Sequence, residues 1–148
     1  EIALACDLII ASDNAVFALP EPRVGLAALA GGLHRLPRMI PQKQALGMIL
    51  TGRRVPAKEG KDLGFVNEVT SQTDLMTTTK RWAGMMLECS PMSLRASKQA
   101  VYKGFDEPSL QDAIKSVYPS VQSLFKSADF VEGPKAFTEK RTPSWTAE

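Results

Sequence analysis

The sequence has few residues of the kinds that build metal sites, disulfide frameworks or strongly charged surfaces. Its 148 residues include two cysteines, Cys6 and Cys89, and one histidine, His34. The cysteines stand far apart without a CxxC pair, which disfavours a metal site or a disulfide, and one histidine excludes a two-histidine site in this chain. A net charge of +2 is too small to indicate binding to nucleic acid or an anionic membrane. No apolar run is long enough to cross a bilayer.

The composition is that of one ordinary globular domain. Apolar residues make up 44% of the chain and charged residues 23%, so it has enough material for a real core. We expect Cys6 and Cys89 to be separate buried thiols in a reducing compartment, and the protein to be cytoplasmic. His34 is expected to be a satisfied or exposed helical residue. The chain begins with Glu1 rather than methionine, and we expect it to be a piece of a longer protein.

Residues 1–70 alternate between short strands and short helices, which predicts an α/β layer arrangement. A short apolar helix follows Glu1, and apolar runs bounded by turn residues predict strands over 7–11, 16–19 and 65–69. Helices are predicted from about Gly32, over 42–51 with Gly52 as the end, and from Pro56 as first helical residue to Gly64.

Residues 71–148 are predicted to be entirely helical. Ser71 and Asp74 resemble a capping box for a helix that buries Trp82, Met85, Met86 and Cys89. A second helix begins at Ser90-Pro91 and reaches about Gly104. The apolar stripe from Leu110 to Phe125 predicts one helix kinked at Pro119, and Asp129 with Glu132 resembles a cap for a last helix reaching Lys140.

Two glutamates, Glu1 and Glu21, are the strongest candidates for chemistry. Glu21 stands between Pro20 and Pro22, and these prolines restrict its backbone. Two held carboxylates on either side of a small pocket can divide acid and base work between them. From these residues alone, a solvated loop carboxylate at Glu21 and a terminal charge at Glu1 remain open as alternatives.

Several segments together resemble the C-terminal half of a crotonase-superfamily protein, the enoyl-CoA hydratase/isomerase group. The match covers essentially the whole chain. The resemblance implies the last part of a crotonase-type ββα spiral over residues 1–70, followed by a helical oligomerisation region over residues 71–148 in a trimer or hexamer. The matching segments are Glu1-Ile2-Ala3-Leu4-Ala5-Cys6-Asp7 through Ala11, Phe17-Ala18-Leu19-Pro20-Glu21, Gly25 with Ala30-Gly31-Gly32, Leu50-Thr51-Gly52-Arg53, Ala57 through Gly64-Phe65-Val66, and Glu132-Gly133 through Ala136-Phe137-Thr138-Glu139-Lys140-Arg141.

The resemblance implies an acyl-CoA hydratase or dehydratase acting on 2-enoyl-CoA thioesters. Glu1 matches the carboxylate that takes the proton of the added water, and Glu21 matches the one that delivers a proton to C2. CoA is part of the substrate, so no separate cofactor is expected, and no metal. In the family both oxyanion donors precede the first glutamate, so we expect this chain alone to be inactive.

The resemblance also implies four substrate-binding positions: Leu29 and Gly31 at the acyl site, and Phe137 and Lys140 at the adenine and phosphate end of CoA, across a subunit boundary. Phe137 has core packing as its alternative, and Lys140 has a solvated helix-end cation. Relatives carry glycine or aspartate where this chain has Leu29. Leucine disfavours dienoyl-CoA isomerase chemistry and is expected to narrow the pocket or displace water.

Two other functions stay open. An enoyl-CoA isomerase of the same superfamily would use Glu21 as its working base. A non-catalytic assembly module would turn the stripe from Leu110 to Phe125 and the helix around Trp82 toward a partner.

Overall fold

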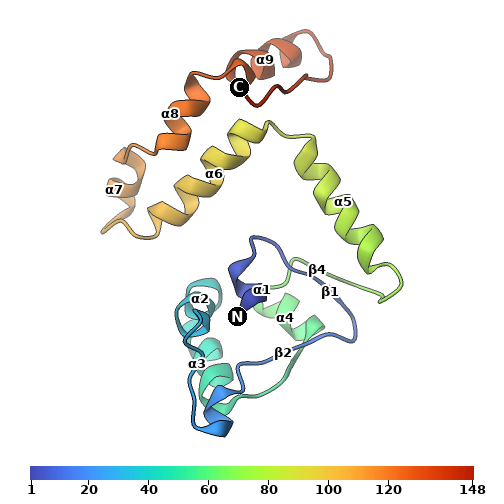
Figure 1. Ribbon diagram of the computed structural model, residues 1–148, viewed down its shortest axis with the longest axis vertical. Coiled ribbons are helices and arrows are strands. Elements are labelled where there is room, and N and C mark those ends of the chain that lie inside the picture. The colour runs from blue at the N-terminus through green and yellow to red at the C-terminus, as the bar shows by residue number, and fades with distance from the viewer. The chain divides into compact units, whose positions relative to one another are not determined.

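The computed structural model describes residues 1–148, which form two compact units, Glu1–Arg81 and Trp82–Glu148 (Figure 1). The boundary between them falls inside helix α5 (Leu75–Leu87). Residues 71–81 therefore belong to the first compact unit, whereas the sequence pattern assigned them to the helical region. The roles predicted for the two regions stay predictions. No helix combines the length and apolar character needed to cross a membrane.

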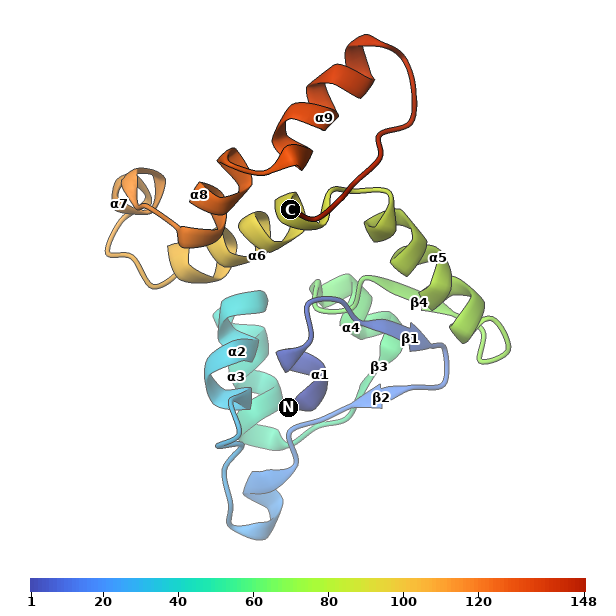
Figure 2. The same ribbon diagram turned by 45° about the horizontal axis from the view of Figure 1, so that its top comes forward.

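The first unit combines helices with two small sheets, which confirms the predicted α/β class. Strand β1 (Ile10–Ser12) pairs with β4 (Glu68–Thr70) in parallel, and β2 (Val16–Phe17) pairs with β3 (Val55–Pro56) in antiparallel orientation (Figure 2). The strands are shorter than the apolar runs that predicted them. The elements are α1 (Ile2–Ala5), β1 (Ile10–Ser12), β2 (Val16–Phe17), the 3-10 helix η1 (Glu21–Val24), α2 (Gly32–Met39), α3 (Gln42–Thr51), β3 (Val55–Pro56), α4 (Ala57–Leu63) and β4 (Glu68–Thr70).

The core of the first unit is apolar and continuous. The rings of Phe17 and Phe65 pack edge to face with centroids 5.2 Å apart, within the range that aromatic pairs prefer. The side chains of Leu36 and Val55 are almost fully enclosed. The core cluster consists of Leu4, Ala11, Leu19, Ala28, Leu36, Ile40, Ala45, Met48, Ile49, Val55, Ala57, Phe65 and Val66.

The second unit consists of helices. Helix α8 (Pro119–Phe125) packs along α6 (Pro91–Gly104), and α7 (Leu110–Lys115) lies beside the C-terminal half of α6 (Figures 1 and 2). Ser90 caps α6, Ser109 caps α7 and Ser127 caps α9, each by accepting a backbone N–H of the first turn. The four helices are α6 (Pro91–Gly104), α7 (Leu110–Lys115), α8 (Pro119–Phe125) and α9 (Ala128–Thr138).

Proline positions account for two corrections to the predicted helices. The single kinked helix predicted from Leu110 to Phe125 is wrong: α7 ends at Lys115, and Pro119 is the first residue of α8. Tyr118, directly before Pro119, is extended at φ −94° and ψ 123°, because a following proline disfavours the helical conformation. Pro56 likewise lies in β3, and α4 begins one residue later, at Ala57.

The burial predicted for the helix around Trp82 is also wrong. Helix α5 has no buried residue, and Met85 and Met86 are each 41% exposed. An apolar face at helical spacing indicates which side chains would pack, but it does not supply the core that covers them. The two thiols, Cys6 and Cys89, are free and exposed rather than buried.

A buried carboxylate, Asp129, joins α6, α9 and the C-terminal tail. It accepts hydrogen bonds from the Ser90 hydroxyl at 2.7 Å and from the backbone N–H groups of Thr146 at 2.9 Å and Ala147 at 3.3 Å. These donors, the Ser90 hydroxyl foremost, hold the pKa of Asp129 below its usual range. Asp129 therefore links segments of the second unit, whereas the sequence pattern assigned it to the helix cap that Ser127 provides.

A second polar contact fixes the tail against α9. The Arg141 guanidinium donates to both carboxylate oxygens of Glu132, at 2.6 and 2.9 Å, and the Ser144 N–H donates to the same carboxylate at 2.8 Å. The Arg141 and Ser144 donors lower the pKa of Glu132 to about 2. The indole N–H of Trp145 donates to the Glu88 carbonyl at 2.9 Å. Polar contacts thus hold residues 141–146 in place.

Candidate active site

Glu1 is held by the first residue of helix α2. Its carboxylate Oε1 accepts the backbone N–H of Gly32 at 2.8 Å, and the Glu1 side chain is half-buried. The first N–H groups of a helix have no partner within the helix, and the positive end of the helix dipole favours a carboxylate there. The first N–H of helix α2 therefore orients the Glu1 carboxylate.

The glycine pair Gly31-Gly32 allows this close approach. Gly31 caps α2 with φ 112°, and its carbonyl accepts the N–H of Arg35 at 2.8 Å. A Cβ on Gly32 would lie 3.1 Å from Cγ of Glu1 and 3.0 Å from a methyl carbon of Leu19. The predicted helix start near Gly32 is confirmed. The binding of Glu1 by the Gly32 amide was not predicted, although a glycine pair at a helix start is a signal for such a close approach.

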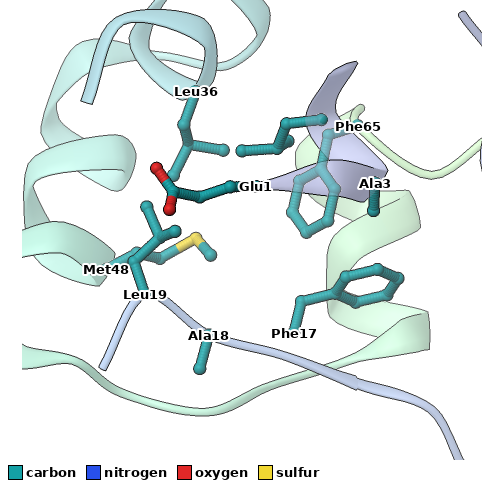
Figure 3. A pocket seen from close by; sticks show the side chains of 9 residues that line it. Glu1, Ala3, Phe17, Ala18, Leu19, Leu36, Met48 and Phe65 are labelled. Atoms are coloured by element: carbon teal, nitrogen blue, oxygen red, sulfur yellow. The ribbon is translucent and has the colours of Figure 1, made fainter. Parts of the chain in front are cut away.

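The Glu1 side chain lies at a small apolar pocket (Figure 3). The pocket encloses about 40 Å³, which exceeds the space that one water molecule requires. Apart from the Glu1 carboxylate, its side-chain lining is apolar, so the carboxylate is the charged group available to a molecule that enters. The lining residues are Glu1, Ala3, Leu4, Phe17, Ala18, Leu19, Leu36, Met48 and Phe65.

Glu21 is the first residue of η1 and is partly buried. Its Oε2 is buried and has no hydrogen-bond partner. Buried polar atoms without partners are uncommon in folded proteins, and each one calls for an explanation, of which a catalytic role is one. Glu21 does not line the pocket at Glu1, so the joint action of the two glutamates stays a prediction.

The other predicted substrate-binding residues are placed as follows. Leu29 lies in the loop before α2, is 79% exposed and does not line the Glu1 pocket, whereas Gly31 caps α2 beside the Glu1 contact. Phe137 is on α9 and is 87% exposed, so the alternative of core packing is wrong. Lys140 follows α9, is exposed and has φ 53°. His34 is exposed on α2, as expected for a residue without a catalytic role.

Comparisons with known proteins identify the family. The sequence profile of the family described as enoyl-CoA hydratase/isomerase matches residues 1–148. Carnitinyl-CoA dehydratase from Escherichia coli strain K12 is 39% identical over 149 residues, which cover 98% of this chain and 57% of the relative. The same enzyme from Salmonella typhi is 38% identical with the same coverage.

Solved structures of the same family have the same fold. Enoyl-CoA hydratase from Mycobacterium tuberculosis H37Rv matches with a TM-score of 0.93 and 33% identity, over 99% of this chain and 58% of that one. Enoyl-CoA hydratase from Bacillus anthracis matches with a TM-score of 0.91 and 33% identity, over 98% and 56%. The chain spans 57% of the length of the curated relatives named above. It belongs to the enoyl-CoA hydratase/isomerase family of the crotonase superfamily and corresponds to the C-terminal part of such a protein.

Proposed function

We propose that the protein containing this chain is an acyl-CoA hydratase or dehydratase that acts on 2-enoyl-CoA thioesters. The observation that carries the proposal is the Glu1 carboxylate, held by the Gly32 amide at an apolar pocket in a chain of this family. Relatives named carnitinyl-CoA dehydratase and enoyl-CoA hydratase support the reaction class. Because this chain spans 57% of the relatives' length, the activity is assigned to the full-length protein, and the chain alone is expected to be inactive.

In the proposed chemistry, two carboxylates act on one water molecule as it adds to the double bond. Glu1 accepts a proton from water while the water oxygen bonds to C3 of the enoyl thioester. The electron pair of the C2–C3 double bond moves toward C2 and the thioester oxygen, and Glu21 delivers a proton to C2. Dehydration is the same sequence in reverse. The unpartnered Oε2 of Glu21 supports this role, because no protein donor competes with the substrate for it.

The CoA portion belongs to the substrate, so the proposal includes no separate cofactor. Phe137 and Lys140 are proposed to bind its adenine and phosphate end. Both side chains are exposed, and an ammonium group attracts phosphates. We further propose a homo-oligomer, a trimer or hexamer. Large exposed apolar side chains in the second unit support this assembly: Phe105, Leu110, Ile114, Val117 and Phe125.

The reaction class is tested by giving the full-length protein short and medium 2-enoyl-CoA thioesters in water enriched in oxygen-18. A hydratase produces 3-hydroxyacyl-CoA that carries the heavy oxygen, which mass spectrometry of the product detects. An isomerase shifts a double bond in 3-enoyl-CoA without taking up the label. A protein that binds no CoA thioester and forms no product would be the non-catalytic assembly module instead.

The variant Glu1→Gln separates the two enzymatic alternatives. It removes the proposed base for water, so a hydratase should lose about 10²- to 10⁴-fold in kcat. An isomerase that works through Glu21 should lose much less. Glu148→Gln is the matched control, because Glu148 is an exposed carboxylate that contacts Ala128 through its backbone carbonyl, and it should keep the wild-type rate.

A further inference from the structure

We propose that the C-terminal end of α3 positions Glu21 through its neighbours Pro20 and Arg23. Thr51 and Gly52, which together form the η1 anchor, contact the 3-10 helix that Glu21 begins. In Figure 1 this helix is the blue turn at the foot of the first unit, below α3. The catalytic consequence rests on the proposed function, whereas the structural part does not. Arg23 and Gly52 are then positioning residues that act on the reaction through Glu21.

The first contact is a hydrogen bond to the end of α3. The Arg23 guanidinium donates through Nε to the Thr51 carbonyl at 3.1 Å. The last carbonyls of a helix lack a partner within the helix and carry the negative end of its dipole, so a cation is favourable there. The Thr51 hydroxyl donates to the Gly47 carbonyl at 2.6 Å and accepts the Arg53 N–H at 3.2 Å, which keeps the last turn in place.

The second contact is the close approach of η1 to Gly52. Gly52 has φ 58°, a conformation that glycine adopts at little cost. A Cβ at this position would also lie 3.2 Å from Cα of Pro20 and 3.1 Å from Nε of Arg23. Pro20 directly precedes Glu21, and backbone atoms cannot yield as the end of a flexible side chain can. A side chain at residue 52 would therefore strain the backbone at this φ and push Pro20 by a few tenths of an ångström.

These contacts reach Glu21 through a single turn of backbone. The Pro20 carbonyl accepts the Arg23 N–H at 3.0 Å, and the Glu21 carbonyl accepts the Leu26 N–H at 2.9 Å. A shift of Pro20 or Arg23 consequently shifts Glu21. Catalytic groups misplaced by about 1 Å can cost about 10²-fold in rate, so the η1 anchor should matter for catalysis without touching the substrate. The Thr51-Gly52 segment thus positions Glu21, a role that the sequence pattern alone did not predict.

Three variants and one control test the η1 anchor. Arg23→Met keeps a long side chain and removes the donor, and Arg23→Lys restores a donor as the conservative rescue. Gly52→Ala introduces the methyl group that meets Pro20. Gly64→Ala is the control, because Gly64 also ends a helix at positive φ, 100°, but an added Cβ there meets nothing within 4 Å.

The catalytic measurement is kcat and KM for hydration of a 2-enoyl-CoA by the full-length protein. Arg23→Met and Gly52→Ala should lower kcat by about 10- to 100-fold at unchanged KM, because the anchor acts on a catalytic group. Arg23→Lys should regain part of the loss, and Gly64→Ala should keep the wild-type kcat. Unchanged kcat in Arg23→Met, or an equal loss in Gly64→Ala, would overturn the inference.

Amide hydrogen–deuterium exchange gives a measurement that requires no activity. The peptide covering residues 20–27 should exchange faster in Arg23→Met and Gly52→Ala than in the wild type and Gly64→Ala. Arg23→Met suffices if Gly52→Ala does not fold. Unchanged exchange in Arg23→Met would overturn the inference that the η1 anchor holds the 3-10 helix. Faster exchange in a protein whose wild type hydrates no enoyl-CoA would support the anchor and refute the proposed function.

Discussion

The two compact units of this chain are stabilised by different kinds of contact. The first buries a continuous cluster of apolar side chains from Leu4 to Val66. In the second, the buried apolar residues are Ala96 and Ala136, and the buried polar ones are Ser90, Ser127 and Asp129. Leu110 and Ile114 of α7 and Phe125 of α8 stay exposed. The first unit is therefore held by apolar burial, whereas hydrogen bonds to carboxylates contribute most visibly to the second, whose apolar surface supports the proposed oligomer.

The largest expected effect contrasts two aliphatic truncations. Leu36 is 1% exposed in the first core, and Leu36→Ala should lower the free energy of unfolding by about 3 kcal/mol, because it leaves a cavity. Ile114 on α7 is 74% exposed, and Ile114→Ala should change the free energy of unfolding by less than about 0.5 kcal/mol. Denaturant unfolding of the isolated chain measures both. Equal costs would mean that Ile114 is buried after all, in a core of the second unit or in the proposed oligomer interface.

Acid should weaken the second unit more than the first, in which Glu59 beside Arg53 is the carboxyl with a lowered pKa. Hydrogen bonds lower the pKa of Asp129, and those of Arg141 and Ser144 lower the pKa of Glu132 from 4.5 to about 2. A depressed carboxyl pKa contributes stability above the unfolded-state pKa, and this stability is lost as pH falls through the folded-state value. For Glu132 the loss should therefore occur between about pH 4.5 and about pH 2.

Amide exchange in the two units, followed from pH 6 downward, would measure this difference. Asp129→Asn should make the second unit less stable at neutral pH and less sensitive to acid. The first unit should keep its exchange pattern in that variant. Loss of exchange protection at low pH that begins in the first unit, or that is equal in both units, would contradict the comparison.

The smallest effect should be the same in both units. Ser109 caps α7, whereas Ser71 begins a Ser-x-x-Asp turn ahead of α5, which starts at Leu75. In both, the serine accepts an N–H at 3.1 Å and donates to the aspartate. Ser109→Ala should lower the free energy of unfolding by about 1 kcal/mol through loss of a helix cap, and Ser71→Ala by about as much, because it removes equivalent local hydrogen bonds. Thermal unfolding compares them. A loss of stability in only one of the two variants would mean that the serine in that unit also makes a contact beyond its neighbouring helix.

Local signals predicted most of the helices. Helix α3 spans the predicted residues and ends at Gly52, α6 follows Ser90, and α2 begins at Gly32. The errors concern contacts that depend on distant parts of the chain. The pattern placed Met85 and Met86 in a core, yet it contained no information about what covers them.

The sequence proposed residues for the candidate site but not the contacts that hold them. Glu1 and Glu21 stood out because of the family resemblance and the prolines around Glu21. The Gly32 amide that holds Glu1 lies 31 positions away along the chain, and no local pattern reports such a pairing. The same holds for Arg23 and Thr51, whose hydrogen bond joins residues 28 positions apart.

The most direct test of the central claim is the rate of 2-enoyl-CoA hydration in Glu1→Gln, Glu21→Gln and the double variant of the full-length protein. If two carboxylates act on one water, removing either one should lower kcat by about 10²- to 10⁴-fold. The double variant should then be no slower than the slower single variant. Losses that multiply in the double variant would mean that the two groups act independently. A single variant with the wild-type rate would remove that glutamate from the mechanism.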